Sequence, residues 1–81
     1  MQVFVDGVEV ELSPKEYFLL KLLMENREKV FSRSDLIDRV WEYDFAGTDR
    51  VVDNQIKKLR KNLGRAGKHI VTSFGRGYKI N

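Results

Sequence analysis

The clearest hydrophobic periodicity in the chain runs from residue 48 to residue 63. Four aliphatic side chains recur there at i, i+4, i+7 and i+11: Val52, Ile56, Leu59 and Leu63. This spacing places them on one stripe of an α-helix. The opposite face then collects Arg50, Asn54, Lys57 and Lys61. The pattern predicts an amphipathic helix, capped by Thr48 or Asp49, that buries one face and exposes a basic one.

The start of the chain alternates between apolar and polar residues and predicts a β-hairpin. Residues 3–5 and 8–12 flank Asp6-Gly7, a pair suited to the two positive φ angles of a type I′ turn. The second strand separates into an apolar and an acidic face: Val8, Val10 and Leu12 on one side, Glu9 and Glu11 on the other. We expect the apolar face to lie on the helices, because an isolated hairpin is marginally stable.

Two capping signals predict the starts of two further helices. Ser13-Pro14-Lys15-Glu16 is a capping box with proline at the first helical position, and it opens a strongly apolar helix that ends near Glu25. Ser32, with Asp35 three residues later, caps a second helix. The buried stripe of this second helix is predicted to consist of Leu36, Ile37, Val40 and Trp41.

The end of the chain predicts a second hairpin. Gly64 suits the position just after the end of the basic helix. Residues 69–74 and 78–80 have strand-like patterns and are joined through Gly75-Arg76-Gly77. An arginine between two glycines at a hairpin tip can approach a phosphate or a minor groove. The order of elements predicts an α+β fold, a winged helix-turn-helix with three helices, an N-terminal β-hairpin and a C-terminal hairpin wing.

Composition narrows the possible functions. The 81 residues form one small domain, residues 1–81, with room for one core. There is no cysteine for disulfide or thiolate chemistry, and the single histidine, His69, lies in no recognisable metal-ligand spacing. The sequence has no apolar run of membrane-spanning length. We therefore expect a cytoplasmic protein that is not an enzyme and needs no metal or cofactor.

Charge is distributed unevenly along the chain. Residues 1–47 carry six basic and ten acidic side chains, a net charge of −4. Residues 48–81 carry nine basic and two acidic side chains, a net charge of +7. This polarity indicates that the C-terminal half binds a polyanion. A basic helix with an amide on its exposed face suits a DNA duplex, because it offers cations to phosphates and hydrogen bonds to base edges.

The motifs, taken together and in this order, resemble the DNA-binding output domain of OmpR/PhoB-type response regulators of two-component systems. They are Leu12-Ser13-Pro14-Lys15-Glu16-Tyr17, Ser32-Arg33, Trp41, Asp49-Arg50-Val51-Val52-Asp53, Leu59-Arg60-Lys61 and Gly75-Arg76-Gly77-Tyr78. The resemblance covers nearly the whole chain and implies sequence-specific binding of double-stranded DNA for transcriptional regulation. The alternative reading is a winged-helix module that binds proteins and not DNA.

The resemblance also implies roles for individual residues. It makes Lys58 a base-reading residue in the major groove and Thr72 a backbone contact from the wing. It suggests that Val51 and Asn54 touch base edges, and that the phosphate contacts are Arg50, Gln55, Lys57 and Arg60. Lys61, on the same helix face, and Arg76, at the wing tip, complete the expected DNA-binding set. Phe74 stands where some members of the family have an arginine in the wing.

The loop of Glu42, Tyr43, Asp44 and Phe45 is similar to one that meets RNA polymerase in activators of this family. Its aromatic residues could instead pack under the helix ends. The resemblance further implies a second copy of the chain on an adjacent half-site and a receiver domain in the full-length protein. The receiver is absent here and the N-terminal sheet is shorter than usual, so we expect the chain to be a fragment.

Overall fold

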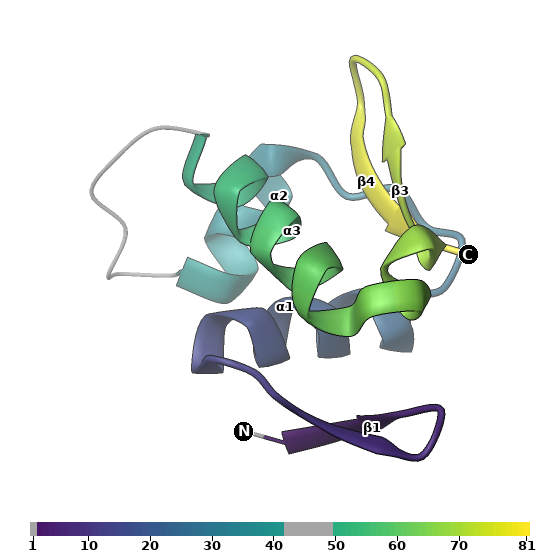
Figure 1. Cartoon of the computed structure of the whole chain (residues 1–81). Helices are drawn as coiled ribbons and strands as arrows, with labels where there is room; N and C mark the ends of the chain where they lie inside the picture. Colours follow the sequence, from purple (N-terminus) through teal and green to yellow (C-terminus); the bar gives the residue numbers. More distant parts are fainter. Residues whose placement is uncertain (1, 42–49) are drawn as a thin grey trace.

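A computed structural model describes residues 2–41 and 50–81, and shows two β-hairpins on opposite sides of a group of helices (Figure 1). The elements in chain order are β1 (Gln2–Val5), β2 (Val8–Glu11), α1 (Pro14–Glu25), α2 (Arg33–Leu36), the π-helical η1 (Ile37–Trp41), α3 (Arg50–Leu63), the 3₁₀-helical η3 (Gly64–His69), β3 (Ile70–Ser73) and β4 (Gly77–Ile80). The predicted winged helix-turn-helix is confirmed. The predicted loop at 42–45 and the caps at Thr48 or Asp49 lie outside the described residues.

The N-terminal hairpin has the predicted turn. Asp6 and Gly7 adopt φ angles of 51° and 81°, and Val5 pairs with Val8 across them. The predicted apolar face is only partly correct, because Val8 is 66% exposed, whereas Leu12, just after β2, is buried. Val8 lies beside the turn, at the end of the ladder. The core-facing contacts of the hairpin come from Val3, Val5 and Val10.

The predicted capping box at the start of α1 is present, and the predicted cap Ser32 also forms one. The Ser13 hydroxyl accepts a hydrogen bond from the Glu16 backbone at 3.2 Å, and a Glu16 oxygen accepts one from the Ser13 backbone at 3.0 Å. Ser32 and Asp35 form the same reciprocal pair. After α2 the chain widens into η1. The side chain of Lys15 donates a hydrogen bond to the Val40 carbonyl at 3.0 Å and so ties this π-helical turn to α1.

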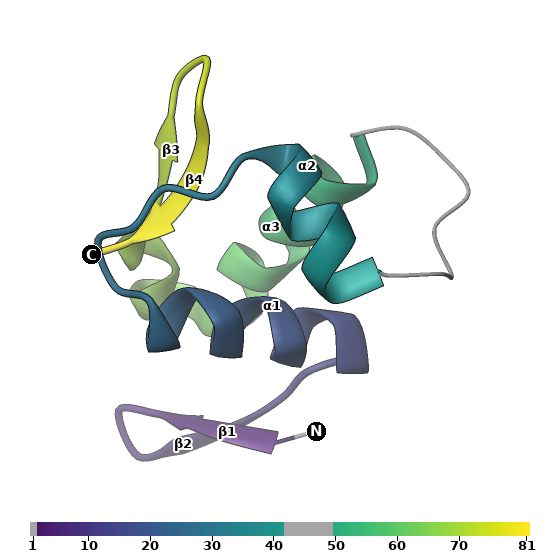
Figure 2. The same cartoon turned by 180° about the vertical axis from the view of Figure 1, so that it is seen from behind.

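The core lies between α1, α3 and the base of the wing. The predicted stripe of α3 is confirmed, since its four aliphatic residues are all buried. The buried residues from the other elements are Leu12, Leu19, Leu23, Phe31, Leu36, Val40, Trp41, Ile70, Tyr78 and Ile80. Phe31 pairs with Tyr78 through an isolated β-bridge, which places the linker before α2 beside β4. Viewed from behind, α1 and α2 lie in front of α3, which is visible between them (Figure 2).

Candidate nucleic-acid interface

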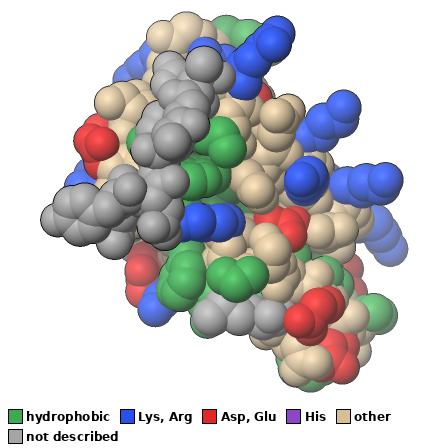
Figure 3. Space-filling view, turned by 90° about the vertical axis from the view of Figure 1, so that its left-hand side faces the viewer, with side chains coloured by type: hydrophobic (Ala, Val, Ile, Leu, Met, Phe, Trp, Pro, Cys, Tyr) green, Lys and Arg blue, Asp and Glu red, His purple; other side chains and the backbone are tan. Residues whose placement is uncertain are grey.

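The exposed face of α3 carries the residues that the periodicity predicted for it. Its exposed side chains include Arg50, Asn54, Lys57, Lys58 and Lys61. Because the opposite stripe is packed into the core, this face cannot turn inward without unfolding the domain. Lys and Arg side chains project along the edge of the molecule on which α3 lies, and acidic side chains gather at the lower end, where the β1–β2 hairpin lies (Figure 3). Val51 and Gln55 flank the face and are half-buried.

The charges of Lys57 and Lys61 are not neutralised by contacts within the described part of the chain, where neither side chain has a hydrogen-bond or ion-pair partner. Lys58 lies on the α1 side of α3. There the Glu16 carboxylate accepts hydrogen bonds from the Ser13 backbone and from the Asn62 amide, the latter at 2.6 Å. Burial opposes ionisation of Glu16, but these bonds and the charge of Lys58 together lower its pKa.

The other flank of α3 is joined to α2 and to the wing through Asp53. One oxygen of its carboxylate accepts hydrogen bonds from the Tyr78 hydroxyl at 2.5 Å and from the Arg33 guanidinium at 3.0 Å. Burial, reinforced by the neighbouring Asp53, raises the pKa of Tyr78. The sequence did not indicate these contacts of Asp53, because no local spacing links it to residues 20 positions before and 25 positions after it.

Arg60 and Thr72, two of the expected DNA contacts, are hydrogen-bonded to each other. The Arg60 guanidinium donates to the Ile70 carbonyl at 3.0 and 2.8 Å and to the Thr72 hydroxyl at 2.9 Å. It also lies over the ring of Tyr78. The structure therefore gives this pair a joint structural role that the sequence did not indicate: they hold β3 beside α3.

The wing ends in a tight turn. The Arg76 backbone N–H donates to the Ser73 carbonyl at 2.9 Å, and Gly75 between them has a φ of 76°. The side chains of Phe74 and Arg76 are exposed at this tip. Arg76 therefore occupies the position predicted for it, on an element whose base is fixed to α3 through Arg60 and Asp53.

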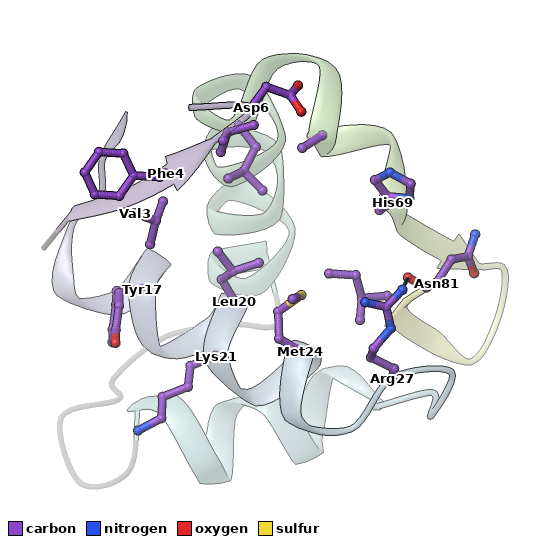
Figure 4. A pocket seen from close by; sticks show the side chains of 14 residues that line it. Val3, Phe4, Asp6, Tyr17, Leu20, Lys21, Met24, Arg27, His69 and Asn81 are labelled. Atoms are coloured by element: carbon purple, nitrogen blue, oxygen red, sulfur yellow. Dashed lines mark hydrogen bonds between the residues drawn. The ribbon is translucent and has the colours of Figure 1, made fainter. Parts of the chain in front are cut away.

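A separate groove of about 520 Å³ lies between the N-terminal hairpin, α1 and the C-terminal residues (Figure 4). Its lining includes Val3, Leu20 and Met24, and Arg27 donates a hydrogen bond to the Asn81 carbonyl at 2.6 Å across one end. Within residues 2–41 and 50–81, no three acidic or histidine side chains come together as metal ligands. None of the helices in these two ranges is long and apolar enough to cross a membrane.

Comparison with known proteins identifies the family. The family described as "Transcriptional regulatory protein, C terminal" matches residues 7–80. Transcriptional regulatory protein ResD of Bacillus subtilis (strain 168) is 46% identical over 83 residues, which cover 98% of this chain and 35% of that protein. The chain thus spans about a third of the length of the curated relatives it matches.

Two solved structures have the same fold. Response regulator DrrB, a Thermotoga maritima OmpR/PhoB homologue, superposes with a TM-score of 0.87 at 35% identity, covering 99% of this chain and 37% of that one. The DNA-binding domain of response regulator AdeR, in complex with an intercistronic region, gives 0.87 at 26% identity over 99% and 84% of the two chains. The chain therefore belongs to the family of C-terminal domains of transcriptional regulatory proteins, in the winged-helix form of OmpR/PhoB-type response regulators.

Proposed function

We propose that this domain binds double-stranded DNA at specific sequences and regulates transcription as the output domain of a two-component response regulator. The exposed basic face of α3, fixed in place by a fully buried opposite stripe, is the observation that carries this proposal. The AdeR domain, which has the same fold, was solved in complex with an intercistronic region, and this supports the same type of ligand.

In the proposed complex α3 lies in the major groove, which is wide enough to admit an α-helix. Lys58, Asn54 and Val51 read base edges. The phosphates on either side are contacted by Arg50, Gln55, Lys57, Lys61 and, from the wing, Arg76. Arg60 and Thr72 act by fixing the position of the wing, because the guanidinium is already bonded to β3.

The division between phosphate and base contacts can be tested with two neighbouring lysines. A binding site is first selected from a random oligonucleotide pool, and affinities for it and for random DNA are then measured by fluorescence anisotropy at several salt concentrations. The wild-type domain should show a slope of log affinity against log salt of roughly −4, as expected when the four cations assigned to phosphates each neutralise one. Lys57→Ala should weaken binding to both DNAs alike. Lys58→Ala should remove about 1–3 kcal/mol of discrimination between them.

A matched control is Lys21→Ala, which removes an exposed cation from α1 and should leave binding unchanged. The alternative function, a protein-binding module that does not bind DNA, would be supported if the wild-type domain failed to retard any duplex. Retardation that survived reversal of the charges of Lys57, Lys58 and Lys61 together would instead contradict the assignment of DNA binding to the basic face of α3. Equal losses on both DNAs for Lys57→Ala and Lys58→Ala would contradict the proposed division of roles.

We further propose the partners of the full-length protein. The matched relatives are about three times as long as this chain, and the remaining length is proposed to contain a receiver domain. A second copy of the domain is proposed to occupy an adjacent half-site, and residues 42–45 to contact RNA polymerase. Such partners would place the protein in the cytoplasm.

A further inference from the structure

The wing presents an apolar ring at its outermost point. Phe74 is 91% exposed, more than any other large hydrophobic side chain of the described residues. It occupies the first corner of the Ser73–Arg76 turn, and Gly75, with its positive φ, occupies the second corner, as in a type II turn. In both views of the fold the tip extends beyond the helices (Figures 1 and 2).

Single exposed phenylalanines are common on protein surfaces. The residues around Phe74 therefore decide whether its exposure indicates a binding function. Phe74 and Arg76 of the wing and Arg33, the first residue of α2, line the same groove. The ring therefore shares this groove with two cations. It is also held at a defined place relative to the basic face of α3, because Arg60 bonds to β3 and Asp53 bonds to Tyr78 on β4.

We propose that Phe74 enters the minor groove next to the site occupied by α3 and wedges against a base step. This inference rests on the proposed function, the binding of DNA. Phenylalanine side chains inserted from the minor groove partly unstack a step and bend the duplex. The neighbouring Arg76 would neutralise a phosphate at the groove edge. Because the ring has no hydrogen-bonding group, it would select a step that opens easily, such as TA or CA, and not a particular base edge.

This contact predicts a loss of affinity that does not depend on salt. Phe74→Ala should weaken binding to the selected site on the order of tenfold, the scale of one aromatic–base contact. Its salt slope should equal that of the wild type, because no charge is removed. Arg76→Ala should instead make the slope shallower by about one. Phe4→Ala is the matched control, since Phe4 is a 73% exposed phenylalanine on the opposite hairpin.

Insertion of the ring can be detected in the DNA. The wild-type domain is titrated into a selected duplex of roughly three helical turns, with a fluorescent adenine analogue placed successively at each step beside the α3 site. Fluorescence should rise at one step for the wild type and Phe4→Ala, and at none for Phe74→Ala. Phe74→Leu should keep part of the signal. Circular dichroism of each variant confirms that it is folded.

The outcomes separate this inference from the proposed function. Binding of wild type and Phe74→Ala with equal affinity and equal fluorescence would overturn the wedge while leaving DNA binding intact. The same result together with a loss of protein self-association in Phe74→Ala would assign the ring to a protein contact, and would also overturn it. Failure of the wild type to bind any duplex would overturn the proposed function and the wedge with it.

Discussion

Gly77 is the residue whose identity the fold restricts most tightly at the wing. Its φ of 142° is unfavourable for any residue with a side chain, and a Cβ atom there would collide with the backbone carbonyl of Phe31. The close approach exists because Phe31 and Tyr78 form a β-bridge through paired backbone hydrogen bonds of 2.8 and 2.9 Å. Gly77 thus allows the linker before α2 to pair with the wing.

Gly77→Ala is expected to lower the free energy of unfolding by about 3 kcal/mol or more, since it combines backbone strain with a collision against backbone atoms. Gly75→Ala is the matched control: its φ is also positive, but a Cβ there meets open space. It should cost only about 1 kcal/mol. Urea unfolding followed by circular dichroism measures both. Equal costs for the two variants would show that the Phe31 contact is not restrictive.

At the scale of elements, α3 is held by hydrogen bonds on both flanks. Hydrogen bonds of Asp53 and Arg60 join α3 to the wing. A hydrogen bond from Asn62 to Glu16 joins α3 to the start of α1. Glu16 has two tasks, since one oxygen completes the capping box and the other accepts from Asn62. These ties set the angle at which the basic face and the wing are presented together.

The Glu16 tie should make stability depend on acidity. The folded-state pKa of Glu16 lies below its ordinary value of 4.5, so ionised Glu16 stabilises the fold above that pH. The contribution is lost as the pH falls through the lower, folded-state pKa. Glu16→Gln should therefore cost about 1 kcal/mol near neutral pH and less at an acidic pH below 4.5. Urea unfolding at both pH values measures this. Glu9→Gln, on the exposed face of β2, is the control, and a cost independent of pH would contradict the prediction.

At the scale of the whole molecule, the domain is elongated and electrically polar. Its longest extent is 34 Å, close to the roughly 34–36 Å of one turn of B-form DNA. Two copies on half-sites one turn apart would lie on the same side of the duplex, and they would touch when the longest axis of each runs along the DNA. The acidic N-terminal half and the basic C-terminal half also make a head-to-tail order electrostatically favourable.

Joint binding of two copies is expected to depend on the spacing of the half-sites. With centres about 10 base pairs apart, the second copy should bind more tightly than the first. Insertion of about 5 base pairs places the copies on opposite sides of the duplex and should abolish this gain. Electrophoretic retardation on duplexes with both spacings measures the difference. A gain that survives the half-turn insertion would contradict direct contact between copies.

The sequence by itself determined the elements and the two faces of α3. Helical periodicity, capping boxes and turn glycines involve residues at most four positions apart, so backbone geometry alone relates them to structure. This is why the buried stripe, the starts of α1 and α2, and the Asp6-Gly7 turn were all correct. Val8 was wrongly expected to face the core, because alternation along a strand does not show that its end beside the turn extends past the helices. The π-helical end of α2, which is hydrogen-bonded to Lys15 of α1, was not predicted.

Only the tertiary structure decided what the flanks of α3 do. Arg60 resembled a DNA contact in the sequence, but packing of β3 against α3 brings the Ile70 carbonyl and the Thr72 hydroxyl within reach of its guanidinium. Asn62 meets Glu16 across 46 positions of the chain for the same reason. Such bonds depend on the angle and offset between packed elements. Local periodicity does not encode these quantities. It therefore distinguishes an exposed helix face from a buried one, but it does not show which basic side chains on the exposed face form hydrogen bonds within the fold.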